Sequence, residues 1–121
     1  MVMRGNLIPM AMLVAAAGAT PDFIARLEAQ RPIAFAAGSV LGIARACEVP
    51  RVETESWRRH IELRWRVHLT DALALQLIEL MRDAAQDGYR AGLRQRAAAC
   101  PEIRHQMHLL EDTVNRTTRA P

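Results

Sequence analysis

Residues 38–47 read GSVLGIARAC and residues 88–100 read GYRAGLRQRAAAC, and the two segments share one pattern. Each contains G-x-x-x-G, then a further helical stretch, then a cysteine with a proline nearby. Glycine costs about 1 kcal/mol in a helix interior, so four glycines at this spacing need an explanation. We expect two neighbouring parallel helices to approach closely at their glycine faces, with a bend or loop at Asp87-Gly88 or a coincidental similarity as alternatives. The four glycines are Gly38, Gly42, Gly88 and Gly92.

The chain contains two cysteines, Cys47 and Cys100. An even number of cysteines in an exported protein indicates a disulfide, which would staple the same end of both glycine-bearing helices. Bonded cysteines have Cα atoms within about 7 Å of each other. An unbroken helix from Thr54 to Ala99 would be about 70 Å long and would separate them. The chain must therefore turn near Thr70-Asp71 and return as an antiparallel hairpin. Two reduced thiols in a cytosolic protein are the alternative.

The composition favours helices. Half of the 121 residues are hydrophobic, 24% are charged and only 4% are aromatic, and Ala, Leu, Arg and Glu, which favour helices, are abundant. We predict an all-α fold, a small antiparallel bundle of about four helices stapled by one disulfide. The helical domain is expected over residues 20–114, with a frayed polar tail at 115–121. The expected helices begin at Thr20-Pro21, at Pro32 after a break at Arg31-Pro32, at Thr54, at Thr70-Asp71 and at Cys100-Pro101.

Residues 1–19 resemble a secretory signal peptide. A single charge, Arg4, precedes an apolar run over residues 7–17, and Ala17-Gly18-Ala19 places small residues before a cut at Thr20. The run is shorter than the roughly 20 residues that cross a bilayer. We therefore expect cleavage and a periplasmic or secreted mature chain without a transmembrane segment. An apolar first helix in the core of a cytosolic protein is the alternative.

Trp57 and Trp65 lie eight positions apart on nearly the same helix face, and Arg58 and Arg59 are beside them. The four residues could form a partner surface. For the two rings we favour packing in the core. For the arginines we favour a solvated face, because Glu55–Arg59 and Glu62–Arg66 are i,i+4 pairs that stabilise a helix by themselves.

Glu102 and His105 form an E-x-x-H motif on the last helix, and His108 follows one turn later. Similar motifs ligate metals in helical bundles, where further carboxylates on facing helices complete the site. Here the motif occurs once, so we favour solvated side chains and expect neither a metal nor a cofactor. A metal-binding bundle that uses these three residues remains an alternative.

No catalytic motif is present: the chain contains no G-x-S-x-G, H-E-x-x-H or phosphate-binding loop. The formal net charge is +3, but acidic residues are spread among the arginines, which does not indicate nucleic-acid binding. We therefore predict a non-enzymatic, exported binding or accessory protein of a bacterial envelope, of the chaperone, inhibitor or immunity type. Its partner is expected to be another protein. A cytosolic helical regulator with reduced thiols is the alternative.

Overall fold

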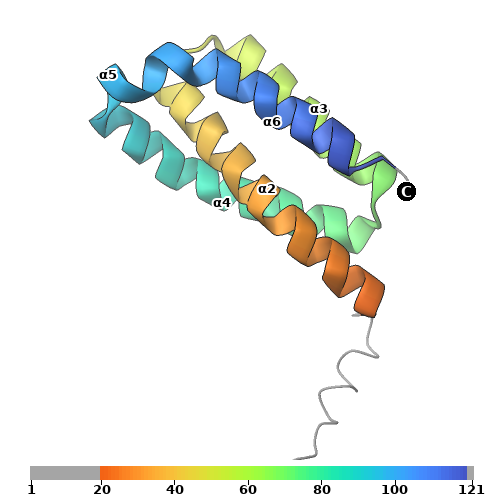
Figure 1. The fold of residues 1–121 in the computed structure, drawn as a ribbon. Helices are drawn as coiled ribbons and strands as arrows, with labels where there is room; N and C mark the ends of the chain where they lie inside the picture. The colour runs from red at the N-terminus through yellow and green to blue at the C-terminus, as the bar shows by residue number, and fades with distance from the viewer. Residues whose placement is uncertain (1–19, 120–121) are drawn as a thin grey trace, which may run out of the picture.

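The computed structural model describes residues 20–119, which are helical almost throughout and contain no strand. The expected signal peptide, residues 1–19, and the last two residues lie outside this range. Two short elements, α5 and the 3-10 turn η1, connect the third long helix to the fourth (Figure 1). The long helices are α2 (Pro21–Ala46), α3 (Arg51–His68), α4 (Asp71–Arg94) and α6 (Ile103–Thr117), and the short elements are α5 (Arg96–Ala99) and η1 (Cys100–Glu102).

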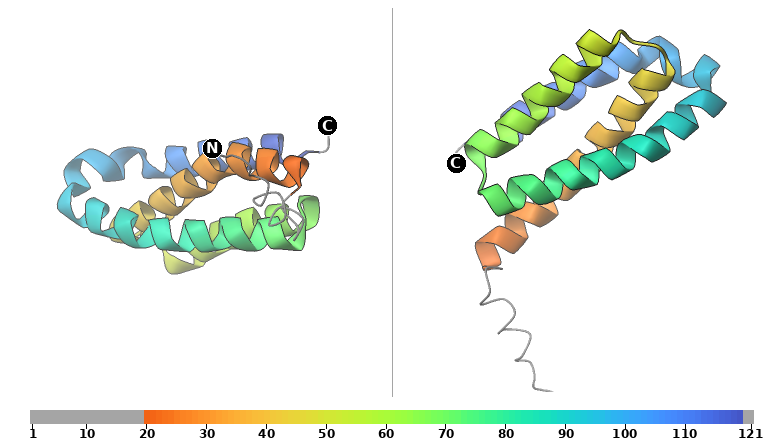
Figure 2. Two further views of the ribbon diagram at one scale, coloured as in Figure 1. Left: turned by 90° about the horizontal axis from the view of Figure 1, so that it is seen from below. Right: turned by 180° about the vertical axis from the view of Figure 1, so that it is seen from behind.

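The four long helices form a bundle in which consecutive long helices run in opposite directions (Figures 1 and 2). As a result α2 runs parallel to α4, and α3 runs parallel to α6. The most extensive contact is between α2 and α4, which lie side by side. The predicted turn between α3 and α4 is confirmed, because α4 begins at Asp71 and the Thr70 hydroxyl accepts a hydrogen bond from the Leu73 amide. The predicted all-α bundle is therefore confirmed.

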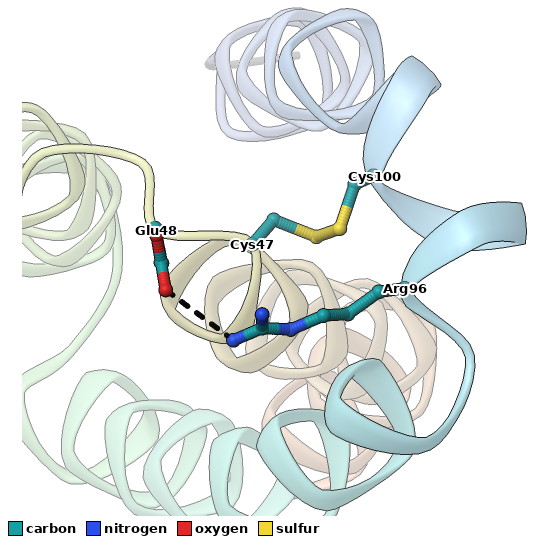
Figure 3. Close-up of a disulfide and its surroundings, with 4 residues drawn as sticks. All are labelled: Cys47, Glu48, Arg96 and Cys100. Carbon is teal, nitrogen blue, oxygen red and sulfur yellow. Dashed lines mark hydrogen bonds and ion pairs between the residues drawn. A yellow bond between two sulfur atoms is a disulfide. The ribbon is translucent and has the colours of Figure 1, made fainter.

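The predicted disulfide is also present. Cys47 and Cys100 are bonded, with an S–S distance of 2.05 Å and a Cα–Cα distance of 5.4 Å. The bond joins the end of α2 to the start of η1, which follows α4 and the short α5 (Figure 3). Arg96 of α5 reaches Glu48 across the same connection, with Nη2 3.5 Å from Oε2. The disulfide therefore holds the α4–α6 connection against the end of α2.

The predicted break at Arg31-Pro32 is wrong, because α2 continues through Pro32. Proline lacks an amide hydrogen and cannot complete the helical bond to the residue four positions earlier. Pro32 is exposed, so the carbonyl left without its donor lies where solvent can satisfy it. Buried residues such as Gln30 and Ala34 lie on both sides of the proline. Their burial in the bundle holds both halves of α2 in one helix.

Thr54 is not the N-cap of α3, which begins three residues earlier at Arg51, after Pro50. Pro50 restricts the chain to an extended conformation there, with φ −52° and ψ 139°, and so sets the helix start. Thr54 is instead buried inside the first turn, where its hydroxyl donates to the Arg51 carbonyl at 3.1 Å.

The alternative bend at Asp87-Gly88 is not found. Helix α4 passes through both residues and ends at Arg94, where Gln95 leaves the helical conformation at φ −131° and ψ 39°. Gly88 is buried against α2, where its missing side chain is needed for contact with Ser39. Packing on α2 therefore keeps this part of α4 helical.

Residues 115–118 differ from the frayed tail expected at 115–121. Helix α6 extends to Thr117, and Thr118 is buried. The Arg64 guanidinium of α3 donates to the Asn115 carbonyl at 2.9 Å and to the Thr118 hydroxyl at 3.1 Å. These bonds fix residues 115–118 on the bundle. The polar composition of residues 115–121 predicted fraying, because it does not show that Arg64, about 50 residues earlier in the sequence, binds this segment.

Candidate functional site

The two tryptophans belong to the core, as favoured from the sequence, and the alternative that they form part of a partner surface is wrong. Trp57 is 6% exposed and Trp65 is fully buried. The Trp57 indole donates to the Met107 carbonyl at 2.9 Å, and the Trp65 indole donates to the Gln30 side chain at 3.4 Å. Both polar groups are thus satisfied inside the bundle, which buried tryptophans require.

Arg58 lies in a network of ion pairs within α3. Its guanidinium donates to Glu55 Oε1 at 2.8 Å and to Glu62 Oε2 at 2.6 Å. The hydrogen bonds from Arg58 hold the pKa of the Glu55 carboxyl below its usual range, and those to Glu55 and then Glu62 raise the pKa of Arg58. Arg59 is exposed. Glu55 therefore pairs with Arg58, three residues later, and not with the expected Arg59. Glu62 pairs with Arg58, four residues earlier, and not with the expected Arg66.

The weak metal candidates are Glu102, His105 and His108, and all three are exposed on one short segment of η1 and α6. Within residues 20–119 no group of three or more histidine, cysteine or acidic side chains is arranged to hold a metal ion. His108 lines a groove together with Glu53, His60 and Glu111, but these side chains do not form such a group.

The four glycines lie in the contact between α2 and α4. A Cβ atom at Gly42 would overlap the carbonyl oxygen of Ala85 and lie 2.5 Å from the Tyr89 amide nitrogen. A Cβ atom at Gly88 would lie 2.9 Å from the Ser39 Cα atom. Any side chain at these positions would push the helix backbones apart. The glycines therefore set the spacing of the two helices.

An arginine-lined cleft of about 600 Å³ opens where α2, α3 and α4 meet. Four arginines come from the three helices, and Glu55 is the one carboxylate among the lining residues. Leu41 and Ala85 provide a buried apolar floor, and Gln86 and the half-exposed Tyr89 lie along the α4 wall. The arginines are Arg45 of α2, Arg58 of α3 and Arg82 and Arg90 of α4.

Glu55 ties the α2 and α3 walls of this cleft together. Its Oε2 atom is 3.1 Å from Arg45 Nη2, and its Oε1 atom is 2.8 Å from Arg58 Nη2. One carboxylate therefore bridges two guanidinium groups from different helices. The bridge orients both arginines but also neutralises part of their charge.

A second groove, of about 420 Å³, runs between α3 and α6. Glu53 and Arg104 form a two-pronged ion pair across it, at 2.9 and 3.0 Å, which lowers the pKa of Glu53. His60 Nε2 lies 3.1 Å from Asn115 Oδ1 and 3.5 Å from a Glu111 oxygen. Glu53–Arg104 and His60–Glu111 thus join the two helices across the groove, which His108 also lines.

Sequence reasoning identified Arg58 as part of a surface but missed Arg45, Arg82 and Arg90. The spacing Arg82-Gln86-Arg90 is i, i+4, i+8, which places the three on one stripe of α4. That signal was available in the sequence. Its meeting with Arg45 depends on the rotation of α2 against α4, which no local pattern gives.

None of the helices within residues 20–119 has the length and apolar character needed to cross a membrane. Comparisons of the chain with models of protein families, with curated proteins and with solved structures found no significant match. Its function must therefore be inferred from its own residues.

Proposed function

We propose that the protein is a non-enzymatic, exported binding protein of the accessory type, such as a chaperone, inhibitor or immunity protein, that works in the periplasm or outside the cell. The disulfide between Cys47 and Cys100 is the observation that carries this proposal. Structural disulfides persist in oxidising compartments and are rare in the cytosol of mesophiles. The signal-like pattern of residues 1–19 supports the same compartment independently.

The architecture supports binding as the mode of action. The helices are fixed by a close α2–α4 contact and a covalent bond, while a charged cleft stays open to solvent between them. A rigid scaffold binds with little loss of conformational entropy, because its side chains are already in place. A partner protein would meet oriented guanidinium groups, which recognise carboxylates and phosphates.

Intact mass spectrometry tests the proposal. The full chain is produced in a bacterium that has an oxidising periplasm, and periplasmic and cytosolic fractions are analysed separately. We expect a periplasmic species that lacks residues 1–19 and carries two hydrogens fewer than the reduced chain. Leu13→Arg, which interrupts the apolar run, is the matched control and should leave a full-length, cytosolic protein. A wild-type chain that stays full-length with two alkylatable thiols would favour the cytosolic regulator instead.

A further inference from the structure

The arginine-lined cleft concentrates positive charge. Four guanidinium groups and one carboxylate line the cleft. Two further carboxylates, Glu62 and Asp87, pair with its arginines, so an excess of one positive charge remains. A concave site with an excess of one sign of charge attracts ions of the opposite sign. The cleft is therefore suited to an anion.

The arginines of the cleft differ in how strongly they are already paired with carboxylates. Arg45 and Arg58 already bind Glu55, and Arg58 also binds Glu62. On the α4 wall, Arg90 makes a 3.4 Å pair with Asp87 in which both side chains are more than 60% exposed, and such pairs are weak. No ion pair of Arg82 is found within residues 20–119. The α4 wall thus offers donors to an incoming ligand.

The donors on this wall form a row. Arg82, Gln86 and Arg90 follow one another at four-residue intervals, and all three are exposed. Residues at this spacing lie on the same side of a helix, one turn apart. The row presents two guanidinium groups and an amide to the same space. Planar guanidinium groups bind phosphate and carboxylate oxygens with two parallel hydrogen bonds.

The rest of the cleft indicates a ligand larger than an inorganic ion. The volume of about 600 Å³ lies within the range of small-molecule sites. Leu41 and Ala85 line the floor but are almost fully buried, so the accessible apolar surface comes mainly from Tyr89, which is 44% exposed. An aromatic or apolar group can pack against the Tyr89 ring while its anionic group meets the arginines.

The cleft is held in shape by the contact that the glycines allow. Gly42 packs directly against the backbone of Ala85 and Tyr89, so α2 and the α4 wall cannot shift independently. Glu55 fixes the third wall to α2 through Arg45. The helices that carry the donors are therefore held at a fixed spacing, which reduces the entropic cost of binding.

We propose that this cleft binds a small organic anion, a phosphomonoester with an aromatic or apolar body, with Arg82 as the principal donor. The phosphate group lies along the row Arg82-Gln86-Arg90, and the organic body packs on the floor beside Tyr89. The proposal goes beyond the proposed function, because it adds a small-molecule ligand to a protein whose proposed partner is another protein.

Isothermal titration of the purified, oxidised protein at low ionic strength tests the proposal, with phenyl phosphate as the probe. We expect saturable binding with one site per chain. Inorganic phosphate should bind about tenfold more weakly, because it lacks the group that contacts the apolar floor. Arg82→Gln should weaken phenyl phosphate binding by about tenfold or more, because one charge-assisted pair of hydrogen bonds is lost.

Arg116→Gln is the matched control, because it removes the same charge from α6, which does not line the cleft. Its affinity for phenyl phosphate should equal that of the wild type. Circular dichroism of both variants should match the wild type, since both arginines are exposed. Absence of binding to the wild type, or an equal loss in both variants, would overturn the proposal.

Vesicles distinguish a lipid headgroup from a free phosphate ester as the source of the anion. Phosphatidic acid vesicles, whose headgroup is a phosphomonoester, are compared with phosphatidylcholine vesicles in a sedimentation assay. Phenyl phosphate binding together with Arg82-dependent binding to the anionic vesicles identifies a lipid, and phenyl phosphate binding alone identifies a free ester. Vesicle binding without phenyl phosphate binding contradicts the cleft as a ligand site. Failure here leaves the mass experiment unaffected, so the two proposals fail separately.

Discussion

At the scale of single residues, Glu48 takes a conformation that its side chain disfavours. Its φ of 63° is the one positive value at a non-glycine position within residues 20–119. The Glu48 amide donates to the Arg45 carbonyl and the Val49 amide to the Ala44 carbonyl, both at 3.1 Å. This pair of bonds is the Schellman motif that ends many helices, and glycine is its usual residue at the position of Glu48. The α2–α3 connection thus requires a left-handed backbone conformation at position 48. The glutamate there gives no indication of it, as a glycine would have.

Replacing this residue by glycine should stabilise the protein. Glu48→Gly removes the steric penalty of a left-handed residue with a Cβ atom, and we expect the free energy of unfolding to rise by roughly 0.5–1 kcal/mol. The ion pair with Arg96, which is lost, is exposed and contributes little. Urea unfolding followed by circular dichroism measures the difference. Glu48→Gln, which keeps the strained backbone but removes the charge, should change stability far less. A glycine variant no more stable than the glutamine variant would contradict this account.

At the scale of elements, the close contact between α2 and α4 is possible because the glycines in it have no Cβ atom. Gly42 approaches the backbone of α4, whereas a Cβ atom at Gly92 would first meet a side chain, the Ala46 Cβ atom at 2.7 Å, and then the Ile43 Cα atom at 3.2 Å. Two kinds of obstacle therefore lie in one contact. Backbone atoms cannot be removed by substitution, but the Ala46 methyl group can.

This difference predicts which glycine variants can be rescued. Glycine-to-alanine changes in an exposed helix stabilise by about 1 kcal/mol. Gly42→Ala should instead destabilise by about 2–3 kcal/mol, because the two helices must separate. Gly92→Ala should also destabilise, but the double variant Gly92→Ala with Ala46→Gly should recover much of the loss. Urea unfolding of the four proteins measures these effects. A Gly42→Ala variant as stable as the wild type would show that the helices are not held at this distance.

Much of the helical framework was readable from local sequence. Thr20 and Thr70 cap their helices as predicted, each accepting a hydrogen bond from the amide three residues later. The cysteine pair fixed the position of the turn near Thr70, since a straight helix could not join the two sulfurs. The errors occur where packing overrides a local signal: Pro32 does not interrupt α2, and Asn115 and Thr118 are held by Arg64.

At the scale of the whole molecule, the cleft could not be predicted in the same way. Its arginines come from three helices, and Arg45 lies 37 positions before Arg82 in the sequence. Each helix shows which of its faces is apolar, but not which polar side chains of two helices will face the same space. The rotation and separation of α2 and α4 decide that, and both depend on the glycine contact. The tryptophans were ambiguous for a related reason, because only the tertiary fold shows that Met107 and Gln30 satisfy their indole groups.

The disulfide acts on the whole molecule because it crosses 53 positions of the chain. A loop of this length implies a stabilisation of about 4 kcal/mol when the unfolded chain is constrained. The bond also secures the α4–α6 connection, since α5 contains no buried residue and η1 contains none. Within that connection, the covalent bond and the exposed Arg96–Glu48 pair are the principal attachments to α2.

Loss of the Cys47–Cys100 disulfide, by reduction or by substitution, should therefore lower the stability of the whole protein and loosen the α4–α6 connection locally. We expect the free energy of unfolding of Cys47→Ser/Cys100→Ser to fall by about 4 kcal/mol, measured by urea unfolding against the oxidised protein. In native conditions, amide hydrogen exchange should increase first at residues 95–102, while the α2–α4 contact stays protected, because its packing does not involve the sulfurs. Glu48→Gln/Arg96→Gln, which breaks only the exposed ion pair, should leave both quantities nearly unchanged. If exchange rose equally along α2 and α4 in the reduced protein, the disulfide rather than the glycine contact would be what holds these helices together.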